Sequence, residues 1–490
     1  MSNKVNIRCL PTGLAGFDAL LGGGIPEFSF NLIAGQPGTG KTTFAHQLMF
    51  ALANPDRRAL FFNVLGEPAL KMLRYQQRFN FFDVDKVDAS IRFVSLADDA
   101  RDGDLDRVLA RIIKEVGAFS PGLVFVDSFR SLGRAAEHGP DGGSRLQLFV
   151  QQLGLQLTSW QATTFLIGEY PFELDTNPIF AIADGIVWLS QNVHRSSMVR
   201  QMQVIKMRGQ ATIPGLHNFR ISDDGITVFS RTVLNFQNVT KLGNERLTMG
   251  IPRMDEMLGG GLPSGYSLLI AGPSGSGKSI LSTKFLAEGA RLGEPGVIAA
   301  FEQSPAQSRS RKLDDLIVAG KIGLVESHAL DLSIDETVHD LVEMITRMNA
   351  NRVVIDSLSG FELALAATPR EEFRESLYRM VRLLTGMGVT VVMTSELEDR
   401  YTDLRFSPYG SAFLTDAIIV QRYIEVLSQV KRVMAVVKVR ASMHSRELRM
   451  YEIDNDGIVI GKMLPEYEGL LGGRPNIKLS SQQHSDDGKT

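Results

Sequence analysis

Cysteine is almost absent from this 490-residue sequence. The single residue, Cys9, excludes an intramolecular disulfide framework and favours a reducing compartment. Long apolar runs are also missing, since none approaches the ~18 residues of a membrane-spanning helix. The start, MSNKVNIRCL, has neither the apolar stretch nor the small-residue cleavage site of a secretory signal. We therefore expect a cytoplasmic protein with no membrane segment.

An excess of either charge is lacking as well. The 52 Lys and Arg residues nearly balance the 55 Asp and Glu residues, giving a formal charge of −3. The whole molecule thus lacks the basicity typical of a nucleic-acid partner, and nucleic acid is not an expected partner. His46 and His217 are isolated in the sequence, and one cysteine excludes a Cys/His metal cluster.

What the sequence does contain is an internal repeat. TGLAGFDALLGGGIP, from Thr12, recurs as MGIPRMDEMLGGGLP from Met249, and a glycine-rich loop follows each copy. Later landmarks keep the order and nearly the spacing, with separations of 237, 229, 232 and 232 residues. These pairs are Gly35 and Gly272, Asp127 and Asp356, Asp184 and Asp416, and Lys206 and Lys438. One domain type is therefore used twice.

The repeat predicts four parts: a domain at 1–232, a linker at 233–246, a domain at 247–462 and a tail at 463–490, the last dozen residues disordered. Each copy alternates strand and helix patterns, with buried strands at 123–126 (LVFV) and 353–355 (VVI). This predicts an α/β fold, with a mostly parallel sheet flanked by helices in each domain. Apolar residues at helical spacing follow each loop: Phe44, Ala45, Leu48, Met49 and Leu52, and Ile280, Leu281, Phe285 and Leu286.

The pattern G-x-x-x-x-G-K-[ST] occurs at 35–42 and at 272–279, each time after a strand pattern and before a helix pattern. Glycines let backbone N–H groups converge on a phosphate chain, and the following helix adds its N-terminal dipole. We expect ATP here, with Lys41 and Lys278 reaching the β/γ-phosphates and Thr42 and Ser279 ligating Mg²⁺. The nucleotide-binding candidates are Gly38, Thr39, Gly40, Lys41, Thr42 and Thr43, and Gly275, Ser276, Gly277, Lys278, Ser279 and Ile280.

Carboxylates that end strands complete the candidate site. Asp127 and Asp356 close apolar runs, where they suit the second Mg²⁺ ligand, although a helix cap would also use Asp-Ser. Hydrolysis needs a group that positions water, and Glu67 and Glu302 follow the next strand of each copy. Glu302 is also a metal-ligand candidate, and the alternative for both glutamates is a solvated surface carboxylate.

Two cations recur late in each copy as K-x-R. Lys206 and Arg208 in the first copy, and Lys438 and Arg440 in the second, lie in strand patterns that place both side chains on one face. They suit a clamp on the γ-phosphate of a neighbouring subunit. The alternative is a solvated sheet edge that discourages aggregation.

We call the repeated segments that begin at Thr12 and Met249 the preludes. Together with the glycine loops, the Asp-Ser pairs and the K-x-R motifs, they resemble the KaiC family of circadian-clock ATPases over about residues 10–475. The resemblance implies two RecA-like domains in a double hexameric ring, with ATP at subunit interfaces and the K-x-R residues acting from the adjacent protomer. It adds His444 to the second site, where the first copy has Thr212. Each copy keeps one of the family's paired glutamates, which implies slow hydrolysis.

Two further features follow from the resemblance. Ala412 and Phe413 occupy the family's two phosphoacceptor positions, so its autophosphorylation cycle is not expected. The nearest hydroxyls are those of Ser411 and Thr415. The tail segment YEGLLGGRP (467–475) resembles the family's pore loop, which precedes the segment bound by a regulatory protein.

The leading hypothesis is a ring-forming ATPase whose nucleotide state alters its shape for a signalling partner. Two alternatives stay open: a scaffold that ATP assembles without being hydrolysed, and a RecA-like motor acting on DNA.

Overall fold

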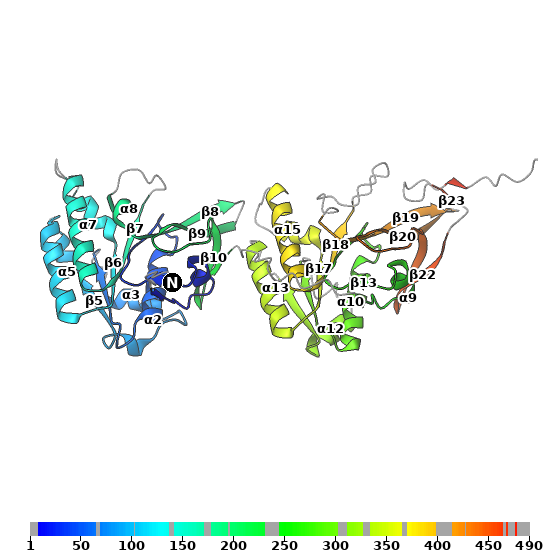
Figure 1. Ribbon diagram of the computed structural model, residues 1–490, viewed down its shortest axis with the longest axis horizontal. Helices are drawn as coiled ribbons and strands as arrows, with labels where there is room; N and C mark the ends of the chain where they lie inside the picture. The colour runs from blue at the N-terminus through cyan, green and yellow to red at the C-terminus, as the bar shows by residue number, and fades with distance from the viewer. Residues whose placement is uncertain are drawn as a thin grey trace, which may run out of the picture. The chain divides into compact units, whose positions relative to one another are not determined.

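The computed structural model describes the chain as two compact units, residues 1–233 and 234–490 (Figure 1). The described residues are 8–64, 69–101, 103–136, 142–170, 178–194, 197–230, 245–301, 311–326, 334–364, 370–397, 414–426, 428–463, 467–468 and 476–477. Both units are built on a nine-stranded sheet.

In the first unit, six neighbouring strands are parallel and three further strands extend the sheet in antiparallel fashion. The parallel strands are, in order across the sheet, β5 (Ile91–Ser95), β4 (Ala59–Asn63), β6 (Leu123–Asp127), β7 (Thr163–Glu169), β3 (Phe30–Gly35) and β8 (Gly185–His194). The extension is β9 (Ser197–Met207), β10 (His217–Ser222) and β11 (Gly225–Phe229).

Helices cover both faces of this sheet because the strand residues are apolar on both sides. Phe44 and Leu48 of the loop helix α2 (Lys41–Leu52) pack with Phe61, Phe125 and neighbours on one face. On the other face lie α5 (Leu105–Phe119), α6 (Phe129–Ala136), α7 (Gly142–Ser159) and α8 (Pro178–Ile182). The shorter elements are β1 (Cys9–Leu10), α1 (Phe17–Leu21), β2 (Ile25–Pro26), α3 (Ala69–Gln76), a 3-10 turn (Val84–Lys86) and α4 (Ala97–Ala100).

The second unit repeats this plan strand by strand. Its sheet runs β16 (Ile322–Glu326), β15 (Gly296–Ala300), β17 (Arg352–Asp356), β18 (Thr390–Glu396), β14 (Ser267–Gly272), β19 (Ala417–Val426), β20 (Gln429–Val439), β21 (Arg449–Asp454) and β22 (Gly457–Met463). Its helices are α9 (Pro252–Met257), α10 (Lys278–Leu292), α12 (Arg311–Val318), α13 (Ile334–Met348), α14 (Leu358–Ala364) and α15 (Arg370–Gly386). The remaining strands are β12 (Arg246–Leu247), β13 (Leu262–Pro263), β23 (Tyr467–Glu468) and β24 (Asn476–Ile477). The predicted tandem α/β fold is therefore confirmed.

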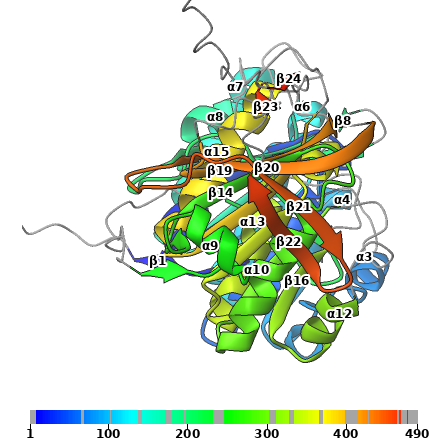
Figure 2. The same cartoon turned by 90° about the vertical axis from the view of Figure 1, so that its right-hand side faces the viewer.

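The β21–β22 hairpin lies over the start of the loop helix α10 (Figure 2). A Cβ at Gly277 would stand 2.8 Å from the side chain of Ile453 on this hairpin. At Gly40 it would stand 2.7 Å from Ile221 of the corresponding hairpin in the first unit. Both glycines also have φ of 94°, so only glycine fits the start of either helix.

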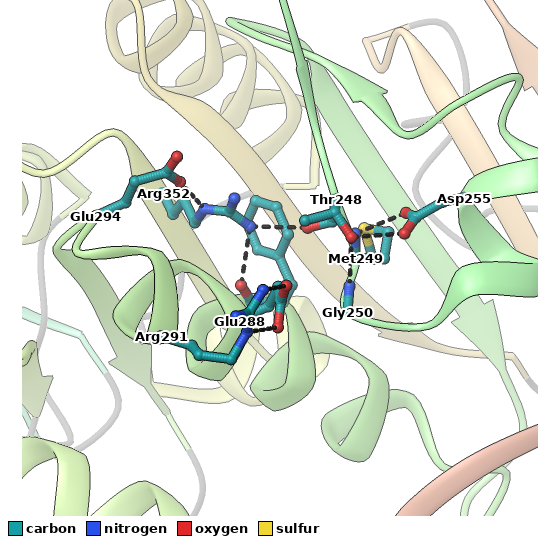
Figure 3. A network of polar contacts seen from close by, with 9 residues as sticks. Thr248, Met249, Gly250, Asp255, Glu288, Arg291, Glu294 and Arg352 are labelled. Carbon is teal, nitrogen blue, oxygen red and sulfur yellow. Dashed lines mark hydrogen bonds and ion pairs between the residues drawn. The ribbon is translucent and has the colours of Figure 1, made fainter.

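A buried arginine ties the amino end of β17 to α10 (Figure 3). Arg352 has no exposed surface, and its guanidinium donates to the Glu294 carboxylate at 2.7 Å. It also donates to the carbonyl oxygens of Thr248 at 2.9 Å and Phe285 at 3.0 Å. Arg352 thereby joins three segments of the second unit: β17, the end of α10 and the prelude before β14. The first unit has the buried Leu123 at this position.

The buried helix faces were predicted correctly with one exception. Ile280, which we expected on the core face of α10, is 39% exposed, because it lies in the first turn beside the loop. Within the described residues, no helix is both long and apolar enough to cross a membrane.

Candidate functional site

The first glycine loop connects β3 to α2 and has a geometry suited to an anion. Gly38 and Gly40 have φ of 76° and 94°, the left-handed conformation that turns successive N–H groups toward one point. The Lys41 ammonium donates to the carbonyl of Gln36 at 2.7 Å. Burial lowers the pKa of Lys41, although the carboxylates of Glu169 and Asp127 oppose the shift. The loop therefore combines a partly buried cation with the backbone conformation typical of anion-binding loops.

The second loop connects β14 to α10 in the same manner. Gly275 and Gly277 have φ of 75° and 94°. The Lys278 ammonium donates to the carbonyls of Gly272 at 2.9 Å and Pro273 at 2.8 Å. In each unit the lysine bonds to loop carbonyls, which it would exchange for phosphate oxygens when a nucleotide binds.

The first pair of predicted metal ligands lies in direct contact. The Thr42 hydroxyl donates to the Asp127 carboxylate at 2.8 Å, so both oxygens are available to one small cation. In the second unit the Asp356 carboxylate accepts a hydrogen bond from Thr394 on β18, and Ser279 occupies the position of Thr42 in the helix. Both aspartates precede a cis peptide bond to a serine. Among the described residues, no cluster of three His, Cys, Asp or Glu side chains could hold a metal alone.

Two strand-end glutamates were missed by the sequence reasoning. Glu169 ends β7 and lies level with Gly35, while Glu396 ends β18 and lies level with Gly272. Each therefore borders its phosphate loop from the adjacent strand, and Glu169 acts electrostatically on Lys41. The signal was present, since both close apolar runs, TTFLIGE and TVVMTSE, as the predicted aspartates do.

The K-x-R residues lie toward the amino ends of the parallel strands, whereas the phosphate loop follows the carboxyl end of β3 or β14. Lys206 pairs with Ile186, which is level with Leu32, and the backbone N–H of Arg208 bonds to the carbonyl of Asp184 beside the amino end of β3. At ~3.3 Å per residue, roughly 16 Å along β3 separates the level of Arg208 from Gly35, and roughly 10 Å separates the level of Lys206, whose ammonium bonds to the carbonyl of Ala181, from the same glycine. The cations therefore do not meet a phosphate held by the loop of their own unit.

Each K-x-R pair has the same local partners. Arg208 forms an ion pair with Asp184 at 3.0 Å, and Arg440 forms one with Asp416 at 3.2 Å. The Lys206 ammonium donates to the carbonyl of Ala181 at 3.1 Å. Burial, followed by repulsion from the adjacent arginine, lowers the pKa of Lys206.

The second copy repeats this pattern. The Lys438 ammonium donates to the carbonyl of Thr415 at 2.6 Å. Burial lowers the pKa of Lys438, and Arg440 adds repulsion. Both arginines lie one residue beyond the end of their strand rather than within it, which corrects the predicted placement.

A cavity of about 580 Å³ opens beside the second K-x-R motif. Ser267, Leu414, Asp416 and Arg440 line it from the amino edge of the sheet, and α15 lines it with Arg374, Tyr378 and Arg382 among others. Three arginines, Arg374, Arg382 and Arg440, are among its lining residues. The cavity lies by the amino end of β14, whereas the phosphate loop of the same unit follows the carboxyl end of that strand.

Several predicted residues lie outside the described part of the chain: Glu67, Glu302, Ser411, Ala412 and Phe413. Of the linker and tail, only 245–246, 463 and the short β23–β24 ladder are described. Thr415 is described and fully buried, and His444 is half-buried shortly after the second K-x-R motif.

The donor sets fit a magnesium nucleotide. Hydroxyl and carboxylate oxygens are the ligands that Mg²⁺ prefers, and Thr42 and Asp127 supply one of each within hydrogen-bond distance. The left-handed glycines give the loops their turns, and a Cβ at Gly40 or Gly277 would collide with the packed hairpin rather than allow the same loop conformation. The amine of each lysine is close enough to move from loop carbonyl to phosphate.

Comparison with known proteins agrees with this geometry. The family model described as "ATPase: KaiC" matches residues 10–233 and again 247–464. A circadian clock oscillator protein KaiC from Rippkaea orientalis is 26% identical over 483 residues, covering 96% of this chain and 92% of the relative. KaiC from Parathermosynechococcus lividus is 26% identical over 481 residues, covering 95% and 87%.

A third relative is the circadian clock protein KaiC3 from Synechocystis sp., which is 26% identical over 497 residues, covering 97% of this chain and 96% of the relative. The match thus runs over both repeats and nearly the full length of each relative. The nucleotide-binding geometry and the matched repeats together show that this chain belongs to the KaiC family of ATPases.

Proposed function

We propose that the chain hydrolyses Mg·ATP in both units, within a ring of identical copies, and that the nucleotide state regulates a partner. The observation that carries the proposal is the Thr42–Asp127 contact beside a glycine loop with its lysine, together with the same elements in the second unit. The glycine loop, its lysine and the strand-end aspartate, together called the phosphate cradle, recur at matched positions in the second unit, which supports the same chemistry there.

Each part of the cradle has a defined task. The loop N–H groups and Lys41 or Lys278 hold the phosphate chain and stabilise the charge that develops on it. Thr42 with Asp127, and Ser279 with Asp356, would hold Mg²⁺, which neutralises charge on the β- and γ-phosphate oxygens. Water then displaces the β-phosphate oxygen at the γ-phosphorus, giving ADP and phosphate.

The water-positioning groups are Glu67 and Glu302 in this proposal, and Glu302 is also proposed as a metal ligand. Glu169 and Glu396 border the loops from the neighbouring strands and are proposed to shape the field at the γ-phosphate. The sequence has a single glutamate after β4 and a single one after β15, where the family resemblance implies a pair, and this supports slow turnover.

The remote K-x-R cations support action between copies. Lys206, Arg208, Lys438 and Arg440, with His444, are proposed to reach the nucleotide held by the adjacent protomer, because the strand length keeps them from their own loop. A hexamer, a cytoplasmic location and a regulatory protein at the tail complete the proposal. Ala412 and Phe413 lack hydroxyls, so no autophosphorylation is proposed.

Phosphate release tests this function. Purified protein with Mg·ATP is expected to release phosphate slowly, and Lys41→Ala with Lys278→Ala is expected to abolish release by removing both phosphate contacts. Glu67→Gln in the Lys278→Ala background should slow the first unit about a hundredfold or more, consistent with loss of a positioned base.

Two results would overturn the proposal or part of it. Unchanged release in the double lysine variant excludes these loops as the site of hydrolysis. Persistent ring assembly with ATP, but no phosphate at any protein concentration, would instead show a scaffold that ATP holds together.

A further inference from the structure

The two phosphate loops are held in place by different contacts. In the second unit, the buried Tyr451 of β21 donates its hydroxyl to the carbonyl of Ser276 at 2.6 Å. The Ser276 hydroxyl donates to the side chain of Gln421 on β19 at 3.0 Å. Tyr423, also on β19, donates to the carbonyl of Ser274 at 3.3 Å. Three side chains from two strands thus bond to this loop.

The first loop lacks two of these three bonds. Phe219 stands where Tyr451 stands in the second unit and has no hydroxyl, and Leu189 stands at the position of Gln421. The Thr39 hydroxyl bonds within its own loop instead, to the carbonyl of Gln36 at 2.9 Å. From the adjacent strand, Gln191 donates to the carbonyl of Pro37 at 3.2 Å, as Tyr423 donates to the carbonyl of Ser274 in the second unit.

The equivalence of these positions rests on strand register as well as on the repeat. Leu189 lies level with Gly35, the first glycine of its loop, and Gln421 follows Val420, which lies level with Ala271. Phe219 pairs with Val228 on its hairpin, as Tyr451 pairs with Ile460. The difference in side-chain contacts therefore comes from substitution, because the backbone plan is the same.

The bond from Tyr451 fixes a particular peptide plane. The carbonyl of Ser276 and the N–H of Gly277 belong to one planar peptide and point in opposite directions. Holding that carbonyl toward β21 therefore directs the Gly277 N–H away from β21, and in the proposed function this N–H is one of the donors to the phosphate. Burial raises the pKa of Tyr451, so its hydroxyl stays protonated and remains a donor at any physiological pH.

Gln421 adds a second constraint. Its side chain has no exposed surface, and its Nε2 has no hydrogen-bond partner among the described residues. A buried amide with an unused donor is destabilising relative to the leucine of the first unit. Gln421 therefore carries a cost in folding free energy that leucine would avoid, while its side chain provides the hydrogen bond to Ser276.

We propose that Tyr451 and Gln421 are positioning residues that pre-organise the second phosphate loop, so that the second unit releases nucleotide more slowly than it would with the side chains of the first. This inference rests on the proposed nucleotide binding. A loop that is already ordered loses less conformational entropy when the phosphate chain binds, so the affinity is higher. The higher affinity appears mainly as a lower dissociation rate.

Nucleotide dissociation from each unit tests the inference. The full chain carrying Lys41→Ala reports the second site, and the full chain carrying Lys278→Ala reports the first. Fluorescent methylanthraniloyl-ADP is displaced by excess ADP in a stopped-flow instrument. Tyr451→Phe and Gln421→Leu, which copy the first unit, should each speed release from the second site roughly three- to tenfold, as expected for one hydrogen bond. Association should change little.

The same substitutions provide their own control. In the Lys278→Ala background, Tyr451→Phe should leave release from the first site unchanged, since Tyr451 belongs to the second unit and its hydroxyl bonds to the second loop. Equal release with and without Tyr451→Phe at the second site overturns the inference, and so does an equal acceleration at both sites. If Tyr451→Phe fails to fold, Gln421→Leu decides the question alone.

Failure of the underlying function has a different signature. Retention of the probe by the Lys41→Ala, Lys278→Ala double variant, or no retention by the wild type, would contradict nucleotide binding at these loops. Loss of the effect of Tyr451 with binding intact would contradict only the pre-organisation of the second loop.

Discussion

At the scale of single residues, His46 shows how the core of the first unit constrains charge. It lies on α2 with no exposed surface, and its ring is 4.8 Å from that of Phe61 and 6.3 Å from that of Phe93. Burial lowers the pKa of His46 to about 4, with the Gln76 side chain opposing the shift only in part. The imidazole is therefore neutral in the folded protein at physiological pH.

His46 predicts a loss of stability in mild acid. The unfolded chain binds a proton at His46 below about pH 6.5, whereas the folded chain binds it only near pH 4. Between these values the unfolded state holds more protons, so stability falls as the pH is lowered, by up to ~1.4 kcal/mol per pH unit. Urea unfolding of the first unit at a series of pH values measures this slope.

His46→Phe supplies the comparison, since phenylalanine has similar volume among aromatic neighbours and does not titrate. The variant is expected to have a shallower dependence between pH 4 and 6.5, while carboxylates contribute equally to both proteins. Identical slopes for wild type and variant would rule out this role of His46.

Site residues could be predicted from the sequence where they belong to a contiguous motif or end an apolar run. Lys41, Thr42 and their counterparts follow from one contiguous pattern, and Asp127 follows from its place at the end of an apolar run. Glu169 was not predicted, because its proximity to Lys41 depends on β7 lying next to β3, although the two are distant in sequence. The contacts of Tyr451 with the second loop could not be foreseen for the same reason.

At the scale of secondary-structure elements, Arg352 makes the second unit differ from the first. Its buried guanidinium depends on Glu294, on two carbonyls and on the Phe285 ring, whose centroid is 4.5 Å away. Because β17 also carries Asp356, the cluster in Figure 3 holds the strand and the loop helix α10 in one arrangement.

Removal of the counter-charge should be the more damaging change. Glu294→Gln leaves a fully buried cation and is expected to lower the free energy of unfolding of the second unit by about 3 kcal/mol. Arg352→Leu, which copies Leu123, should cost less, because the remaining Glu294 side chain is 28% exposed and can be hydrated. Urea unfolding curves of the two variants give the comparison.

Arg291→Ala is a control within the same cluster. Arg291 pairs with Glu288 at 2.7 Å but is 66% exposed, so its loss should leave stability nearly unchanged. A larger effect of Arg352→Leu than of Glu294→Gln would contradict the stated order.

The elements themselves were largely predictable. The apolar runs gave β6 and β17, and the 3.6-residue spacing gave α2, because both patterns are local. Sheet order was not predictable from such patterns, nor was the exposure of Ile280, which depends on where the helix begins relative to the loop.

At the scale of the whole molecule, the separation of loops from K-x-R motifs bears on assembly. A chain with Lys41→Ala and Lys278→Ala keeps its K-x-R motifs, and a chain with alanine at Lys206, Arg208, Lys438 and Arg440 keeps its loops. Each alone is expected to be inactive. Mixed in equal amounts, they should recover about a quarter of the wild-type rate, because a quarter of random neighbours pair intact parts.

Phosphate release from the mixture, compared with each variant alone at doubled concentration, measures the recovery. A mixture no more active than its components would mean that the cations serve their own unit or none. The repeat predicted two units of one type, whereas the contacts between copies belong to the proposed function and are not encoded in any local pattern of one chain.

The phosphate loop and the K-x-R cations lie at opposite ends of β3 in the first unit and of β14 in the second. Under the proposed function this gives each protomer a direction, with one end that offers a nucleotide and one that receives it. A linear row of n such protomers contains n − 1 completed sites per layer, whereas closure into a circle completes all n. If neighbours complete each other's sites as proposed, the last subunit to join creates two sites at once, which would favour full circles over partial ones whenever nucleotide is abundant.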